Sequence, residues 1–165
     1  MASWLALNRR KANAARIQSI AVLPLENLSG DPLQEYFAAG MTDELINKLA
    51  QIKSLRVLSR TSTMQLKSTH KTLGEITRFL NTDAVVEGTV LREGNRIRIN
   101  AELVDAWTDK QLWSQSYDRE AGDALAVQNE LALAIVKGIE ITTRQRTRST
   151  WLERKQLAQR LMTTI

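Results

Sequence analysis

The stretch that decides the fold is AVVEGTVLREGNRIRINAEL, residues 84–103. Residues 84–91 form a short apolar run typical of a buried strand. Residues 97–103 alternate apolar and polar side chains, which is the period of a strand with one face in water. Gly94 and Asn95 lie between them and match a two-residue hairpin turn with glycine first. The sequence therefore predicts two antiparallel strands joined by a tight turn.

On the amino side of this hairpin, two strands flank an amphipathic helix. Residues 19–25, SIAVLPL, and residues 55–59, LRVLS, are short apolar runs that predict strands. For the helix between them we expect Asp31 as the cap and Pro32 in the first position, with Thr42 capping a main segment after a short lead-in turn. Because a helix connects the two strands, they should be parallel.

The remaining elements complete a mixed sheet. Thr72 and Glu75 have capping-box spacing and predict a second helix that ends near Asn81. Residues 111–117 predict a fifth strand, and residues 123–141 predict a long helix with Asp123 as its cap. The buried side of that helix should consist of Val127, Leu131, Ala134, Ile135 and Gly138. The expected class is α/β (α+β), with the order βαβαβββα, a mixed five-stranded sheet and helices packed on the sheet.

Composition excludes several kinds of chemistry. The chain has 165 residues, of which 43% are hydrophobic and 25% charged, with no cysteine and one histidine. Such a chain should fold, and it cannot hold a disulfide, a thiol nucleophile or a multi-histidine metal site. We therefore expect no metal and no cofactor. A chain without cysteine suits the cytoplasm and the periplasm equally, so the compartment stays open.

Basic charge is concentrated in the two ends of the chain. Residues 1–16 carry four basic side chains and no acid, and residues 144–165 carry six basic side chains against one acid. Since the net charge is +5, the segment between them has a net charge of −4. A phosphate-binding face across the folded part is therefore not expected, whereas the tails are candidates for contact with anionic lipid or nucleic acid.

Three regions are expected along the chain. Residues 1–18 form a basic tail, or the end of a membrane-anchor segment in which Trp4 precedes the basic cluster, which would tether the chain to the inner membrane. Residues 19–141 form the α/β domain. Residues 142–165 form a basic helical linker.

Catalytic motifs are missing from the sequence. No GxG glycine spacing, phosphate loop or GxSxG elbow is present. His70 lies in a polar stretch between a strand and a helix, where an exposed loop histidine is the expected role. We assign no catalytic residue and expect the chain not to be an enzyme.

One constellation is a candidate ligand site. If the first two strands are parallel, the loops that follow them lie at the same edge of the sheet, where open α/β sheets place ligands. Their side chains and free helix-start N–H groups would together hold a small anion. The candidate residues are Asn27, Ser29, Gly30, Asp31, Arg60 and Ser62. The alternative is structural: Arg60 pairs with an acid, and the hydroxyl groups complete turns.

Five segments in fixed order resemble the TolB amino-terminal-like domain. They are residues 19–32, 34–46, 55–62, 86–90 and 112–119, within a match that covers about residues 19–141. The resemblance implies a small mixed sheet with helices, related in shape to anticodon-binding domains. It also implies a place in bacterial multidomain proteins, beside adenylate or guanylate cyclase domains or winged-helix transcription regulators, often before tetratricopeptide repeats. It implies no catalytic residues.

The preferred hypothesis is a non-enzymatic regulatory or protein-interaction module of a bacterial signalling protein. Its partners would be another protein or neighbouring domains of a parent chain. The alternatives are a nucleic-acid-binding module with an anticodon-binding-like fold and a small-anion sensor at the sheet edge. The acidic middle of the chain argues against the nucleic-acid alternative.

Overall fold

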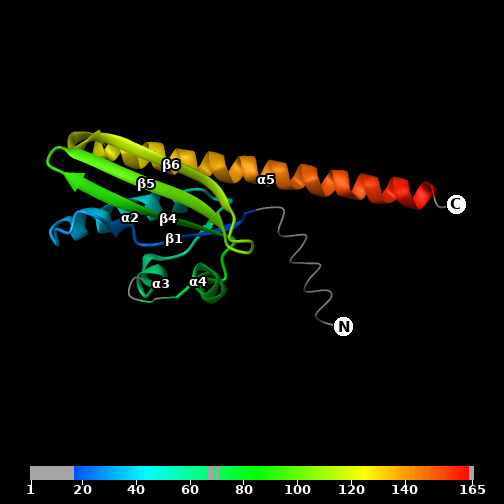
Figure 1. Ribbon diagram of the computed structural model, residues 1–165, viewed down its shortest axis with the longest axis horizontal. Coiled ribbons are helices and arrows are strands. Elements are labelled where there is room, and N and C mark those ends of the chain that lie inside the picture. Colours follow the sequence, from blue (N-terminus) through cyan, green and yellow to red (C-terminus); the bar gives the residue numbers. More distant parts are fainter. Residues whose placement is uncertain (1–16, 67–68, 70, 164–165) are drawn as a thin grey trace. The chain divides into compact units, whose positions relative to one another are not determined.

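The computed structural model describes residues 17–66, 69 and 71–163 (Figure 1). Gln18–Gly138 form one compact unit, and the chain from Ile139 onward lies outside it. The tail expected at residues 1–18 falls almost wholly outside the described residues, so the anchor interpretation stays a prediction. Within the described ranges, no helix combines the length and the apolar character needed to cross a membrane.

A mixed sheet forms the centre of the compact unit. Its main path runs β3-β1-β4-β5-β6, with β2 paired to β4. The pairs β1–β3, β1–β4 and β2–β4 are parallel, and β4–β5 and β5–β6 are antiparallel. The strands are β1 (Ser19–Val22), β2 (Glu26–Asn27), β3 (Arg56–Val57), β4 (Ala84–Glu93), β5 (Arg96–Asp105) and β6 (Gln111–Glu120). The predicted class and the parallel pairing of the first two predicted strands are confirmed. The prediction of five strands was one short, because it did not include β2.

The helices are α2 (Gln34–Ala50), α3 (Arg60–Met64), α4 (Leu73–Leu80) and α5 (Ala124–Thr163). The capping box of α4 is confirmed, because the Thr72 hydroxyl accepts from the Glu75 N–H and the Glu75 carboxylate accepts from the Thr72 N–H. Asn81 ends this helix in the left-handed region, with φ of 49°. Asparagine tolerates that conformation, which explains why the helix stops where the sequence predicted.

Thr42 does not cap a helix. It lies buried inside the continuous helix α2, where its hydroxyl donates to the carbonyl of Ala38 and accepts from the N–H of Leu25. The side chain therefore ties the chain before β2 to the middle of α2. Sequence spacing alone could not distinguish this role from a cap, because both use the same hydroxyl group.

Three helix boundaries also differ from the prediction. The helix starts at Gln34, and Asp31 accepts from the N–H of Leu33 ahead of it, so Pro32 is not the first helical residue. A 3-10 turn, Ala121–Asp123, precedes α5, so Asp123 lies in that turn. The helix predicted for residues 123–141 and the helical segment expected beyond it are one continuous helix, α5.

Helices lie on both faces of the sheet. Val85 packs in a buried cluster with Ile76 of α4 and with Leu66, which lies just after α3, and both helices lie on this face (Figure 1). Leu103 pairs with Val86 and with Trp113, on the opposite face, and Trp113 lies against Gly138 of α5. The side chain of Gln128 in α5 contacts the sulfur of Met41 at 3.1 Å, so α2 lies beside this first part of α5.

The alternation predicted for β5 is confirmed. Ile97, Ile99, Ala101 and Leu103 are buried, whereas Arg96, Arg98 and Asn100 are exposed. At the β4–β5 turn, Gly94 has a positive φ of 55°, as a tight hairpin with glycine first requires. The face that carries the two arginines is the same face that α3 and α4 cover nearer β1.

Candidate functional site

The loop between β2 and α2 is held by its own polar groups. The side-chain carbonyl of Asn27 accepts from the N–H and the hydroxyl of Ser29, at 3.0 and 2.6 Å. The amide of Asn27 donates to the carbonyl of Asp31, and the N–H of Asp31 donates to the hydroxyl of Ser29. Gly30, between them, has a positive φ of 70°. These bonds use amide and hydroxyl donors that an anion would need.

The second predicted loop is a short helix. Arg60 and Ser62 both lie in α3, which Ser59 caps by accepting from the N–H of Ser62. The guanidinium of Arg60 pairs with the carboxylate of Asp43 on α2 at 2.7 Å. This is the structural alternative stated for Arg60: it pairs with an acid.

The structure brings the candidate residues together as two separate groups. Asn27, Ser29 and Asp31 join at the start of α2, whereas Arg60 pairs with Asp43, nine residues after Gln34. With a rise of about 1.5 Å per residue, that spacing along the helix is roughly 13 Å. The assignment of a small anion to these residues stays a prediction. It has less support than before, because the two groups do not converge on one point where an anion could contact both.

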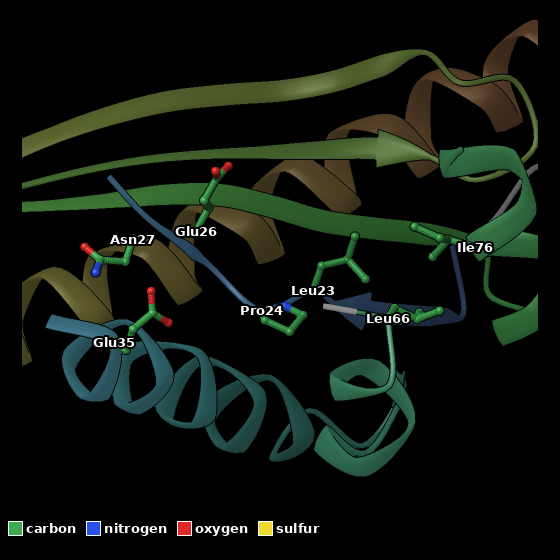
Figure 2. A pocket seen from close by; sticks show the side chains of 7 residues that line it. All are labelled: Leu23, Pro24, Glu26, Asn27, Glu35, Leu66 and Ile76. Atoms are coloured by element: carbon green, nitrogen blue, oxygen red, sulfur yellow. The ribbon is translucent and has the colours of Figure 1, made fainter. Parts of the chain in front are cut away.

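A pocket of about 510 Å³ lies beside the chain that joins β1 to β2 (Figure 2). It has an apolar side and a side with two carboxylates and an amide. The lining residues are Leu23, Pro24, Glu26, Asn27, Glu35, Leu66 and Ile76. Only Asn27 belongs to the predicted site. The other residues belong to no motif that the sequence analysis singled out. Leu66, just after α3, and Ile76 of α4 reach the pocket because this part of the chain packs on the sheet.

The uncovered part of the sheet face carries paired charges. The carboxylate of Asp118 on β6 accepts from Arg96 at 3.0 Å and from Arg98 at 3.1 Å. Hydrogen bonds from Arg96 and then Arg98 lower the pKa of Asp118 below its ordinary value. Both arginines are therefore engaged within the domain.

Two carboxylates face each other on the same surface. Glu87 on β4 pairs directly with Glu102 on β5. Partial burial, followed by the charges of Glu102 and Asp109, raises the pKa of Glu87 above its ordinary value. Like charges in this position destabilise a sheet, so the ionised pair opposes folding at neutral pH.

Two further predictions concerned a metal site and the role of His70. Among the residues that the structure describes, no group of three or more His, Cys, Asp and Glu side chains is arranged to hold a metal ion. His70 lies outside the described residues, so its predicted loop role is untested.

These features define a small α+β domain with a mixed sheet, helices on both faces and self-paired polar clusters. The HilA/YgeH-like transcriptional regulator family, second domain, matches residues 15–134. The chain belongs to this family.

A relative with a different description shares the same domain. The chain is 42% identical over 123 residues to a Rhizobium meliloti (strain 1021) protein named "Putative adenylate cyclase 3". The match covers 74% of this chain and 21% of that protein, so the chain spans about a fifth of its relative. The two matches fit a regulatory or interaction module of a signalling protein.

Solved structures share the fold. The chain superimposes on TolB from Acinetobacter baumannii with a TM-score of 0.56 and 13% identity, over 74% of this chain and 28% of that one. It also matches lipoprotein GNA1162 from Neisseria meningitidis with a TM-score of 0.54 and 24% identity, over 74% and 96% of the two chains. At these identities the likeness concerns the fold alone.

Proposed function

We propose that the domain is a non-enzymatic regulatory and protein-interaction module of a bacterial signalling protein, of the TolB amino-terminal-like type. One observation carries the proposal: the same domain matches a transcriptional regulator family and a protein named as an adenylate cyclase. A regulator and a cyclase differ in the chemistry of their output. A domain common to both is best explained by a role in regulation or in protein contact, because such a role depends neither on transcriptional control nor on cyclic-nucleotide synthesis.

The two alternative functions have weaker support. Arg96 and Arg98, the cations on the exposed sheet face, both pair with Asp118, which reduces their value for phosphate binding. The pocket lining contains Glu26 and Glu35, which disfavour an anionic ligand there. Arg60, the cation proposed for an anion site, pairs with Asp43.

The purified chain tests the non-enzymatic part of this proposal. It would be incubated with ATP and with GTP in the presence of Mg²⁺ or Mn²⁺, and cyclic nucleotide and released phosphate would be measured. We expect no turnover above a protein-free control, because the sequence carries neither a phosphate loop nor an acid pair set to bind a metal ion. Metal-dependent turnover that persists at constant specific activity through repeated purification would refute the proposal.

The regulatory part needs a test in a parent protein. Residues 18–138 would replace the matching segment of the Rhizobium meliloti relative, with a flexible linker of equal length as the control replacement. If the domain is regulatory, cyclic-nucleotide production should differ between the intact relative and the version with the linker. The version with the domain replacement should then regain at least part of the production seen in the intact relative. Equal output from all three versions would contradict a regulatory role.

A further inference from the structure

The pocket beside the chain that joins β1 to β2 has the size of a small-molecule site. Its volume of about 510 Å³ falls within the usual range of ligand pockets, roughly 300 to 1,000 Å³. Its apolar side consists of Leu23, Pro24, Leu66 and Ile76. Leu66 and Ile76 are buried and belong to one core cluster, against which Leu23 packs. The packing of the core therefore holds this side of the pocket in place.

The polar side of the pocket carries negative charge. Glu26 on β2 and Glu35 in α2 line it, and no lysine or arginine of the described residues does. Figure 2 shows these two carboxylates toward one end of the pocket, and Leu66 and Ile76 toward the other. Glu35 already makes an interaction of its own. Glu26 is exposed, and within the described ranges no hydrogen bond or ion pair engages its carboxylate, so Glu26 is open to a ligand.

A third carboxylate, that of Glu87, lies next to the pocket on the sheet. The N–H of Leu23 donates to the carbonyl of Val86, so Leu23 lies beside Glu87. Leu23 packs against the cluster that contains Val85, and Glu87, two residues further along β4, points to the same face. Glu26 pairs with the residue two positions beyond Glu87, so the Cα atoms of the two glutamates lie about 8 Å apart. Negative charge therefore continues from the pocket onto the sheet.

The sheet does not compensate this charge itself. Glu87 faces Glu102 on β5, and like charges in this position destabilise a sheet. The two arginines on the same face, Arg96 and Arg98, both pair with Asp118 instead. A cation bound in the pocket would lie near Glu87 and would reduce the repulsion between the carboxylates. The charge of this region is therefore complementary to a cationic ligand.

We propose that this pocket binds a small organic cation, in which an ammonium group is carried on an apolar body. The ammonium group contacts the carboxylate of Glu26, and the apolar body packs against Leu66 and Ile76. The carboxylates repel an anion, and an entirely apolar ligand would desolvate them without offering a partner. This site goes beyond the proposed function, because binding of a small cation neither requires a protein partner nor prevents contact with one.

Three aromatic probes of similar size and different charge test the class of ligand. Phenethylammonium, phenethyl alcohol and phenylacetate would each be titrated into the isotope-labelled full chain, and binding would be followed by amide chemical shifts. We expect phenethylammonium to bind about fivefold more tightly than the alcohol and to shift the amides of Leu23, Glu26 and Leu66 most. Equal binding of the alcohol, tighter binding of phenylacetate, or no binding of phenethylammonium at millimolar concentrations would overturn the proposal.

Substitutions at Glu26 test the position of the ammonium group. Glu26→Gln keeps the size of the side chain and removes its charge, so the dissociation constant of phenethylammonium should rise about threefold, whereas that of the alcohol should stay the same. Glu26→Lys places a cation at the pocket and should weaken phenethylammonium binding further.

The matched controls are Glu44→Gln and Glu44→Lys, which make the same changes of net charge at an exposed position of α2. They should leave the dissociation constant of phenethylammonium unchanged. A melting midpoint close to wild type would establish that each variant folds, as expected for substitutions of exposed side chains. If the Glu44 variants weaken binding as much as the Glu26 variants do, the attraction is a property of net charge and the proposed site is wrong.

Discussion

Ile99 and Arg98 are neighbours on β5 whose side chains lie on opposite faces of the sheet. Ile99 is fully buried, and Arg98 is exposed in its pair with Asp118. Ile99→Ala leaves a cavity and should lower the free energy of unfolding by about 2 to 5 kcal/mol. Arg98→Ala removes one surface ion pair and should cost less than about 1 kcal/mol. Urea unfolding of both variants measures the difference, and equal losses would contradict the assigned face and register.

The facing pair Glu87 and Glu102 gives a pH-dependent prediction. Because the pKa of Glu87 is raised in the folded state, that state binds a proton more tightly than the unfolded chain does. Ionised Glu87 therefore destabilises the fold at neutral pH, and Glu87→Gln should stabilise it by up to about 1 kcal/mol. The gain should shrink as the pH falls through the folded-state pKa toward the ordinary value of 4.5.

Unfolding free energies of wild type and Glu87→Gln at several pH values between about 4 and 7 would measure this effect. The control Glu44→Gln changes an exposed carboxylate on α2 and should bring no gain. A Glu87→Gln variant that is less stable than wild type at neutral pH would show that the carboxylate contributes a favourable contact there.

At the scale of the elements, two glycines with different surroundings should respond oppositely to alanine. A Cβ at Gly88 in β4 would lie 2.2 Å from the backbone carbonyl oxygen of Asn100, so Gly88→Ala should cost about 1 to 3 kcal/mol. A Cβ at Gly40 in α2 meets nothing within 4 Å, so Gly40→Ala should stabilise the fold by up to about 1 kcal/mol. Thermal and urea unfolding of both variants provide the test, and a gain at Gly88 would contradict the close approach of β4 and β5.

The elements that the sequence predicted well are those with a local signal. The alternation in β5 and the capping box at Thr72 each depend on residues a few positions apart, and both are confirmed. The strand β2 has only two residues and exists because it pairs with Thr89 and Val90, far along the chain. No local pattern encodes such a pairing, which explains why β2 was missed.

The candidate site was harder to predict than the fold. The sequence suggested that Asn27 and Arg60 share an edge, since both follow parallel strands. The pairing of Arg60 with Asp43 and the internal bonds of Asn27 depend on how α2 and α3 pack, and spacing carries no information on that packing. The pocket is lined mainly by residues that the sequence did not indicate, for the same reason.

At the scale of the whole molecule, net charge separates the interaction-module proposal from nucleic-acid binding. Residues 144–165 carry six basic side chains against one acid, whereas residues 17–143 are net acidic. Binding to an oligonucleotide or to anionic vesicles should therefore reside in the tails and fall steeply with salt. A triple variant, Arg144→Gln with Arg148→Gln and Arg154→Gln, should lose most of this affinity in fluorescence titrations.

The matched comparison changes cations on the sheet. Arg96→Gln with Arg98→Gln should leave oligonucleotide binding nearly unchanged, because both side chains already pair with Asp118. If this double variant loses affinity and the tail variant keeps it, the sheet face binds nucleic acid and the interaction-module proposal is wrong.

The parallel pairing of β1 with β4 has a consequence for how the chain folds. Ser19 and Asp83, which join the two strands, are 64 positions apart, whereas β4, β5 and β6 follow one another through short turns. Local pairings close at lower entropic cost, so the three-stranded meander should form first and β1 should dock late. Pulsed hydrogen exchange during refolding would reveal this as earlier amide protection in β5 than in β1. On the ribosome, β1 emerges long before β4, so the edge of β1 that pairs with β4 stays open until β4 has been synthesised.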